Sequence, residues 1–157
     1  MGEGTPKFLI RPAQEGDIPA VLEIAAENGL SFWPSKSYTM ELGNPDALFL
    51  CVEDGAAVKG FAIGQFIRGA GNGGELELYN IGISIKRQRR GMGRALLQCL
   101  AQEAKGSGCS AIWLEVRESN LTGVRFYESF GFAKVYERPS FYSNPTENAL
   151  VLRLELK

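Results

Sequence analysis

The stretch RQRRGMGRALL, residues 87–97, places basic side chains and two glycines directly ahead of an apolar repeat. The apolar residues recur at helical spacing, so Gly91 and Gly93 fall at a helix N-terminus. Backbone N–H groups from Arg90 to Arg94 would carry the positive end of the helix dipole there, beside arginine side chains. A pyrophosphate fits such a junction. The alternative is a helix start that the glycines make flexible, with arginine side chains in solvent and no bound anion.

Two familiar phosphate-binding motifs are excluded by the residues of this junction. A P-loop requires G-x-x-x-x-G-K-[ST], and neither lysine nor a hydroxyl residue follows the glycines at that spacing. A dinucleotide fingerprint requires G-x-G-x-x-G, and Leu96 occupies the third glycine position. What survives is a binding site made mainly of main-chain donors.

The acids and bases of this chain must be found outside histidine, because the sequence contains none. Ser/His/Asp and Cys/His machinery and histidine metal sites are therefore excluded. Glu115 lies in an otherwise apolar strand, where a charge is costly unless it is paired or used; a solvent-facing carboxylate is the alternative. Tyr127 belongs to a helical run of aromatics, which predicts either a core residue or a phenol able to donate a proton.

The motif around the glycines resembles a known signature. QRRGMG matches the Q/R-x-x-G-x-G/A motif of the GCN5-related N-acetyltransferases (GNAT superfamily), whose main chain there holds the pyrophosphate of acetyl-CoA. The resemblance implies acetyl-CoA as co-substrate and no metal. It assigns cofactor binding to a continuous set of residues, namely Gln88, Arg89, Arg90, Gly91, Met92, Gly93 and Arg94.

Within that superfamily, three segments together resemble the RimI-like ribosomal-protein-alanine N-acetyltransferases: LYNIGISIKRQRRGMGRALL, WLEVRESN and FYESFGF. The resemblance implies that Glu115 takes the proton of the acceptor amine and that Tyr127 protonates the departing sulfur of CoA. It also implies that Asn120 contacts CoA. The backbone of Ile81, Gly82 and Ile83 would pair with the pantetheine arm and polarise the acetyl carbonyl.

We therefore expect direct acetyl transfer to an amine, with a covalent acetyl-enzyme as the weaker mechanism. The expected acceptor is a protein N-terminal α-amine, possibly that of a ribosomal protein. A small-molecule amine such as a polyamine, amino acid or antibiotic is the alternative within enzymes. A non-catalytic CoA- or RNA-binding module is the alternative outside them.

The bulk properties restrict the setting. The chain has 157 residues, 45% of them hydrophobic, and a formal net charge of −1. This size predicts one acetyltransferase domain over residues 1–157, with 1–7 as a flexible tail. The near-neutral charge argues against nucleic-acid binding as the main activity. We expect no membrane association and a cytoplasmic location, because no signal peptide or membrane span is visible and the three cysteines have the pattern of buried thiols.

The remaining pattern predicts an α/β or α+β fold: a mixed sheet with helices on both faces. The resemblance implies that this central sheet is mostly antiparallel. The strand at 109–116 is expected to be buried on both faces, and Gly82 to mark a bulge or a close backbone approach. The expected strands are 8–13, a hairpin within 48–67 that turns at Asp54-Gly55, 75–85, 109–116, 133–137 and 149–156, with a loop containing Pro139 and Pro145 between the last two. The expected helices begin at Asp17, after Ser35, near Gly91 with a left-handed cap at Gly106, and at Ser119 or Asn120 with an end at Gly131.

Overall fold

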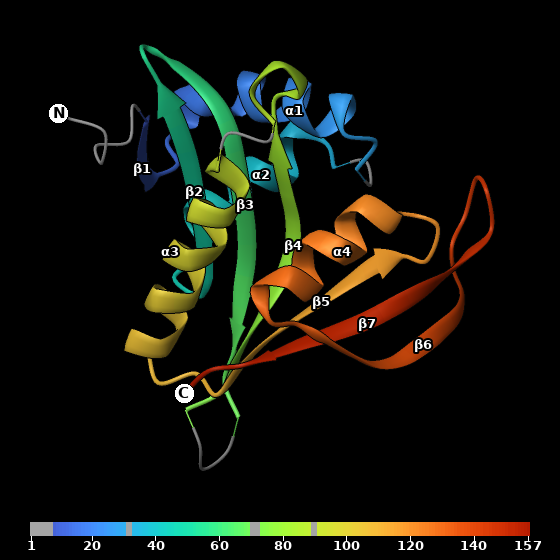
Figure 1. The fold of residues 1–157 in the computed structure, drawn as a ribbon. Helices are drawn as coiled ribbons and strands as arrows, with labels where there is room; N and C mark the ends of the chain where they lie inside the picture. The colour runs from blue at the N-terminus through green and yellow to red at the C-terminus, as the bar shows by residue number, and fades with distance from the viewer. Residues whose placement is uncertain (1–7, 31–32, 70–72, 89–90) are drawn as a thin grey trace, which may run out of the picture. The chain divides into compact units, whose positions relative to one another are not determined.

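A computed structural model describes residues 8–30, 33–69, 73–88 and 91–157, so the expected tail at 1–7 lies outside the described residues (Figure 1). Seven strands are hydrogen-bonded in the order β1-β2-β3-β4-β5-β7-β6. The elements are β1 Phe8–Pro12, α1 Ile18–Glu27, α2 Ser35–Leu42, β2 Ala47–Asp54, β3 Ala57–Ile67, β4 Glu75–Ile83, α3 Met92–Gly106, β5 Ala111–Arg117, α4 Leu121–Phe130, β6 Ala133–Tyr142 and β7 Glu147–Glu155, with short 3-10 turns at Glu15–Asp17 and Ile85–Arg87.

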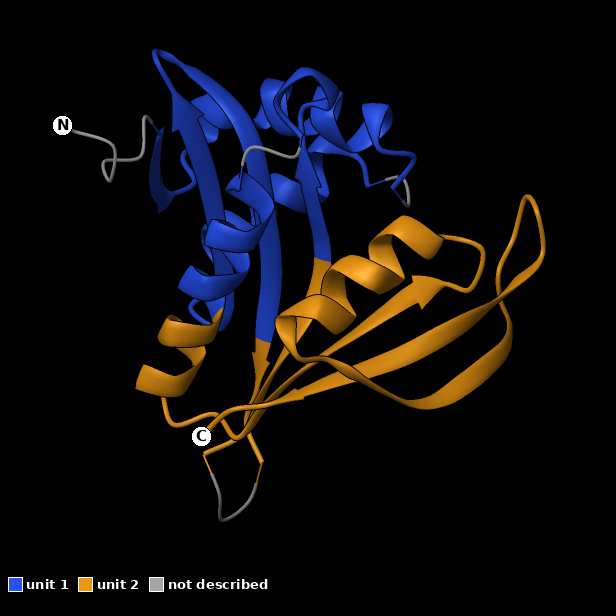
Figure 2. Cartoon of the chain, viewed as in Figure 1, with its two compact units in different colours: residues 1–65, 80–100 blue, residues 66–79, 101–157 orange. Residues whose placement is uncertain are grey.

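The sheet is mixed and mostly antiparallel, as expected. Strands β1 and β2, β2 and β3, β5 and β7, and β6 and β7 pair antiparallel, whereas β4 and β5 pair parallel. The chain forms two compact units, which Figure 2 colours separately: unit 1 is residues 1–65 with 80–100, and unit 2 is residues 66–79 with 101–157. The single acetyltransferase domain stays a prediction.

Unit 1 has helices on both faces of its strands. The side chains of Phe49 and Cys51 on β2 and Phe61 on β3 pack with α1 and with Tyr38 of α2 in one apolar cluster. Since successive strand residues point to opposite faces, the buried residues between them form a second apolar face. Figure 1 shows α3 over that second face. The sequence pattern therefore predicted this layering correctly.

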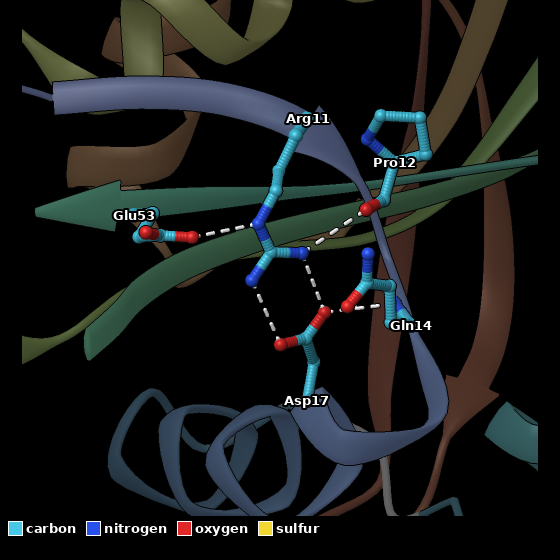
Figure 3. Close-up of polar contacts among 5 residues, drawn as sticks. All are labelled: Arg11, Pro12, Gln14, Asp17 and Glu53. Carbon is cyan, nitrogen blue, oxygen red and sulfur yellow. Dashed lines mark hydrogen bonds and ion pairs between the residues drawn. The ribbon is translucent and has the colours of Figure 1, made fainter. Parts of the chain in front are cut away.

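An ion-pair network fixes the entry into α1 (Figure 3). The Arg11 guanidinium donates to both carboxylate oxygens of Asp17, at 2.7 and 3.0 Å, and to Glu53 at 2.7 Å. Asp17 also accepts from the backbone N–H of Gln14 at 2.7 Å. The expected N-cap position at Asp17 is correct, but its side chain binds Arg11 and Gln14 instead of capping α1. The network joins β1, β2 and the start of α1.

Unit 2 shows two differences from the expected elements. Strand β5 alternates between buried and half-exposed residues, so the expectation that it is buried on both faces was wrong. Strand β6 continues through Pro139 to Tyr142, and β7 begins at Glu147, where a loop had been expected. β6 lies at the edge of the sheet, where the N–H groups on its outer side face no other strand, so a proline there removes no hydrogen bond between strands. The β6–β7 register is also interrupted between Arg138 and Tyr142.

The ends of the two later helices also depend on glycine. α3 includes Gly106, and the left-handed residue is Gly108 with φ of 88°, so the cap expected at Gly106 was wrong. The helix ends at Gly106, and a turn over residues 107–108 closes it, in which Ser107 and Cys109 donate back to the last helical turn. α4 begins after Asn120, whose side chain accepts from the N–H of Gly123 at 2.9 Å, and ends before Gly131 with φ of 125°, as expected.

Candidate active site

The glycine junction in unit 1 has the geometry of an anion-binding helix entry. Gly91 has φ of 87°, in the left-handed region that favours glycine, and α3 begins at the next residue. The N–H of Ala95 donates to the backbone oxygen of Gly91 at 3.0 Å. The first N–H groups of a helix have no partner in the preceding turn. Met92, Gly93 and Arg94 occupy that first turn, whereas Arg89 and Arg90 lie outside the described residues.

Side chains from three elements hold the residues before this junction. The Gln88 side-chain amide donates to the backbone oxygen of Ile83 and to Asn28 Oδ1, both at 3.0 Å. Asn28, at the end of α1, donates to the same Ile83 oxygen at 3.0 Å. Arg87 pairs with Asp54 of the β2–β3 hairpin at 2.9 Å. Gln88 was predicted as a site residue, but sequence reasoning missed Asn28, which is sixty residues away along the chain.

The end of β4 is covered by α1. A Cβ atom built on Gly82 would lie 3.2 Å from the Ile24 side chain and 3.4 Å from that of Asn28. The expected close approach at Gly82 is therefore made by α1. Ile83 is buried and its backbone oxygen accepts the two hydrogen bonds described above, while Ile81 is half-buried.

Glu115 extends from the half-exposed face of β5 in unit 2. Its carboxylate lies 2.8 Å from Nε of Arg138 on β6, with 23% of the Glu115 side chain exposed. Burial raises the pKa of Glu115, Arg138 opposes that rise, and the negative charge of Glu77 adds to it. The result is a carboxyl group with a pKa above its ordinary value, which is a better proton acceptor than an exposed glutamate.

A cavity of about 310 Å³ opens beside Glu115 within unit 2. Its lining combines carboxylates and one arginine with aromatic and aliphatic side chains: Ile67, Glu75, Leu76, Glu77, Trp113, Leu114, Glu115, Tyr136, Arg138 and Val151. The indole nitrogen of Trp113 is buried and makes no hydrogen bond. Such a concave site with few convergent polar groups is typical of small-ligand binding.

Tyr127 and Asn120 lie on and beside α4, also in unit 2. The Tyr127 ring contacts Phe126 and Phe132, with centroids 5.4 and 5.6 Å apart. Burial raises the pKa of Tyr127 above that of an ordinary phenol, which already carries its proton at neutral pH. The Asn120 side-chain oxygen is engaged in the helix cap. The ring of Tyr127 therefore supports the packing interpretation, and its protonated hydroxyl is compatible with proton donation.

Arg117 anchors the turn between β6 and β7. It pairs with Glu147 at 3.1 Å and lies over the Tyr142 ring, with Cζ 4.4 Å from the centroid. Glu147 also accepts from the N–H of Ser119. Burial and the nearby Glu115 raise the pKa of Tyr142 to about 12. Sequence reasoning missed these residues and Arg138, because charges separated by more than twenty positions give no local signal.

In ranges 8–30, 33–69, 73–88 and 91–157, no group of three or more potential ligand side chains could hold a metal ion. Among the same residues, no helix is both long and apolar enough to cross a membrane. None of the three cysteines forms a disulfide; Cys51 and Cys109 are buried and Cys99 is partly exposed.

The mixed sheet, the parallel β4–β5 pair and the glycine junction before α3 define an acetyltransferase of the GNAT class. The sequence pattern of the acetyltransferase (GNAT) family matches residues 18–132, so the chain belongs to this family. Acetyl-CoA is its co-substrate. The residues of the junction fit that role, because first-turn N–H groups and a left-handed Gly91 suit a pyrophosphate.

Individual relatives show which members of the family this chain is similar to. The [ribosomal protein bS18]-alanine N-acetyltransferase of Escherichia coli K12 is 32% identical over 142 residues, which cover 89% of this chain and 92% of that protein. The crystal structure of the E. coli ribosomal-protein-S18-alanine N-acetyltransferase superposes with a TM-score of 0.83 and 29% identity, covering 96% of this chain and 94% of that one. The N-alpha-acetyltransferase RimI of Mycobacterium tuberculosis is 31% identical over 77% of this chain and 74% of its own.

A fourth comparison concerns the fold alone. The Arabidopsis thaliana NAA60 structure in complex with acetyl-CoA has a TM-score of 0.85 at 17% identity, covering 95% of this chain and 98% of that one. The family match and the 32% identical relative show that the chain is an N-acetyltransferase, and its fold is the one that the sequence predicted. The resemblance to the family and to its RimI-like members is confirmed.

Proposed function

We propose that this acetyltransferase modifies the α-amine of a protein N-terminus that begins with a small residue, with a ribosomal protein as the expected acceptor. The relatives that act on bS18 alanine or on N-terminal α-amines support this class of acceptor. The observation that carries the proposal is the Glu115 carboxylate in the cavity of unit 2, where an amine can be deprotonated.

Acetyl-CoA supplies an acetyl group activated as a thioester. The backbone of Gln88, Arg89, Arg90, Gly91, Met92, Gly93 and Arg94 is proposed to bind its pyrophosphate. The N–H groups of Ile81, Gly82 and Ile83 are proposed to pair with the pantetheine arm and to stabilise negative charge that develops on the acetyl oxygen. The Asn120 side chain is proposed to contact CoA.

Glu115 and Tyr127 are proposed to move the two protons of the reaction. The amine reacts in its neutral form: its nitrogen attacks the acetyl carbon, and Glu115, directly or through water, takes the proton that the nitrogen releases as the carbon–nitrogen bond forms. The carbon–sulfur bond then breaks, and Tyr127 donates its proton to the sulfur, so that CoA leaves as a thiol. Glu115 is suited to the first step because its pKa is raised, and Tyr127 to the second because a phenol carries its proton at neutral pH.

The acceptor class also follows from amine chemistry. An α-amine with a pKa near 7.7 to 8 is roughly one-third neutral at pH 7.5, whereas a lysine with a pKa near 10.4 is neutral in about one molecule per thousand. This difference favours the α-amine by about 3 kcal/mol before any contact is made. We also propose a cytoplasmic location, which agrees with three cysteines that form no disulfide, because reducing compartments keep thiols reduced.

The test is mass spectrometry of peptide libraries incubated with enzyme and acetyl-CoA. Peptides that begin with Ala or another small residue should be acetylated faster than the same peptides with a blocked N-terminus and a free lysine. Glu115→Gln should lower kcat by about 10² to 10⁴ while acetyl-CoA still binds. Equal rates on blocked lysine peptides, or activity confined to free polyamines, would reject the N-terminal acceptor.

A further inference from the structure

We infer that Arg138 is a positioning residue for the catalytic base: its guanidinium fixes the Glu115 carboxylate in the cavity of unit 2 and keeps it ionised for proton transfer. The inference rests on the proposed function, because it accepts Glu115 as the base. The direct contact that supports it is the 2.8 Å separation between Arg138 Nε and Glu115 Oε2.

Strand register brings these two residues together. Glu115 on β5 is opposite Val151 on β7, and Val151 is opposite Tyr136 on β6. Arg138 is two residues further along β6, so it extends from the same face of the sheet as Tyr136. An arginine is long enough to reach back diagonally across β7 to Glu115. A one-residue change of register would place Arg138 on the opposite face.

Two aromatic rings hold the guanidinium in place. Arg138 Cζ lies 5.9 Å from the Tyr136 ring centroid and 5.6 Å from that of Phe141. Arg138 also donates to the Tyr136 hydroxyl at 3.4 Å. Guanidinium groups stack on aromatic faces, and their planar geometry fixes the direction in which the N–H groups point. A lysine at this position would carry the charge without that planar contact.

The ion pair is poorly placed to serve as a stability device. The Arg138 side chain is 47% exposed, and ion pairs at that exposure contribute little to folding because water and salt screen them. Arg138 also lines the cavity that contains Glu115. The main physical effect of Arg138 is therefore on the charge state and direction of the carboxylate it contacts.

The charges around Glu115 leave Arg138 as the group that opposes protonation. On β4, Glu77 raises the pKa of Glu115, and Glu75 lines the same cavity. On β6, Tyr142 interacts electrostatically with Glu115, and Arg138 lowers the pKa of Glu115. On β7, Arg153 lies over the Trp113 ring. Removal of Arg138 leaves burial and Glu77, which both raise the pKa of Glu115.

The test compares pH profiles of kcat/KM for wild type, Arg138→Gln and Arg138→Lys on a peptide with a free N-terminal alanine. We expect the acidic limb of Arg138→Gln to move to higher pH by about one unit, with activity restored at alkaline pH, and Arg138→Lys to lie between the two. KM for acetyl-CoA should not change.

Lys134→Gln is the matched control, because Lys134 is on the same strand with the same 47% side-chain exposure and pairs with Glu137 instead. Its profile should superpose on that of wild type. A wild-type profile for Arg138→Gln, or an equal loss of rate at every pH, would overturn the inference, since the second outcome indicates contact with the acceptor.

A second measurement separates this inference from the proposed function. In protein carrying ¹³C-labelled glutamate, the Glu115 carboxyl resonance, assigned with Glu115→Gln, reports its titration without any acceptor. It should titrate at higher pH in Arg138→Gln than in wild type. An unchanged titration overturns the role of Arg138 even if N-terminal peptides are acetylated. A shifted titration sustains it even if the acceptor proves to be a small amine.

Discussion

The left-handed backbone of Gly91 gives a prediction that separates anion binding from helix stability. Its φ is 87°, and a Cβ atom built there would contact nothing within 4 Å. Gly91→Ala therefore meets no steric obstacle, and its cost is the backbone penalty of about 1–2 kcal/mol for an L-residue in the left-handed region. Because Gly91 is exposed, the free protein can relax to another φ and must return to the left-handed conformation on binding.

The expected result is an increase of about 5- to 30-fold in the Kd for acetyl-CoA, which is that penalty expressed as affinity. Isothermal titration calorimetry measures it, and thermal unfolding reports any part of the cost that remains in folding. Gly91→Asn should bind more tightly than Gly91→Ala, because asparagine tolerates the left-handed region better.

Gly108→Ala is the matched control. Gly108 follows the other end of α3 with φ of 88°, and its added Cβ would come no closer than 3.9 Å to the neighbouring Gly73. It should lower the melting temperature by roughly 2–4 °C per kcal/mol and leave the Kd unchanged. Wild-type affinity in Gly91→Ala, or an equal loss of affinity in Gly108→Ala, would refute a pyrophosphate site at Gly91.

Three further predictions concern single side chains. Tyr127→Phe should lower kcat by about 10² to 10⁴ with little change in acetyl-CoA affinity, and a near wild-type rate in steady-state assays would remove Tyr127 from the mechanism. Asp17→Asn should reduce the free energy of unfolding by about 1–3 kcal/mol at neutral pH. Arg11 lowers the pKa of Asp17 below its ordinary value, so the extra stability of wild type is complete above about pH 4 and disappears as the pH falls through the lowered pKa. Urea titrations of both proteins over a pH series test this, and a difference in unfolding free energy that stays constant with pH would contradict it. Asn28→Ala should weaken acetyl-CoA binding about 3- to 10-fold because Gln88 loses one hydrogen-bond partner, at about 1 kcal/mol for such a bond, and additivity with Gln88→Ala in a double-mutant cycle would count against this coupling.

The local elements of this protein could be predicted from the sequence alone. The alternation and the Asp54-Gly55 turn identified the β2–β3 hairpin, and the apolar repeat after Gly91 identified α3. Asn120 and Gly131 marked the two ends of α4. These signals are local, because turn conformation, capping and periodicity depend on neighbours within a few residues. The resemblance to the family also depended on short contiguous motifs.

Tertiary structure alone decided which distant residues meet. Arg138 contacts Glu115 through the register of three strands, and Asn28 contacts Gln88 across sixty positions. Neither pair has a local pattern, because strand register is set by how whole side-chain faces pack. The continuation of β6 through Pro139 likewise depended on its place at a sheet edge, where a missing N–H costs no ladder hydrogen bond. The sequence therefore determined the chemical groups, and the packing of distant strands and helices determined their charge state and neighbours.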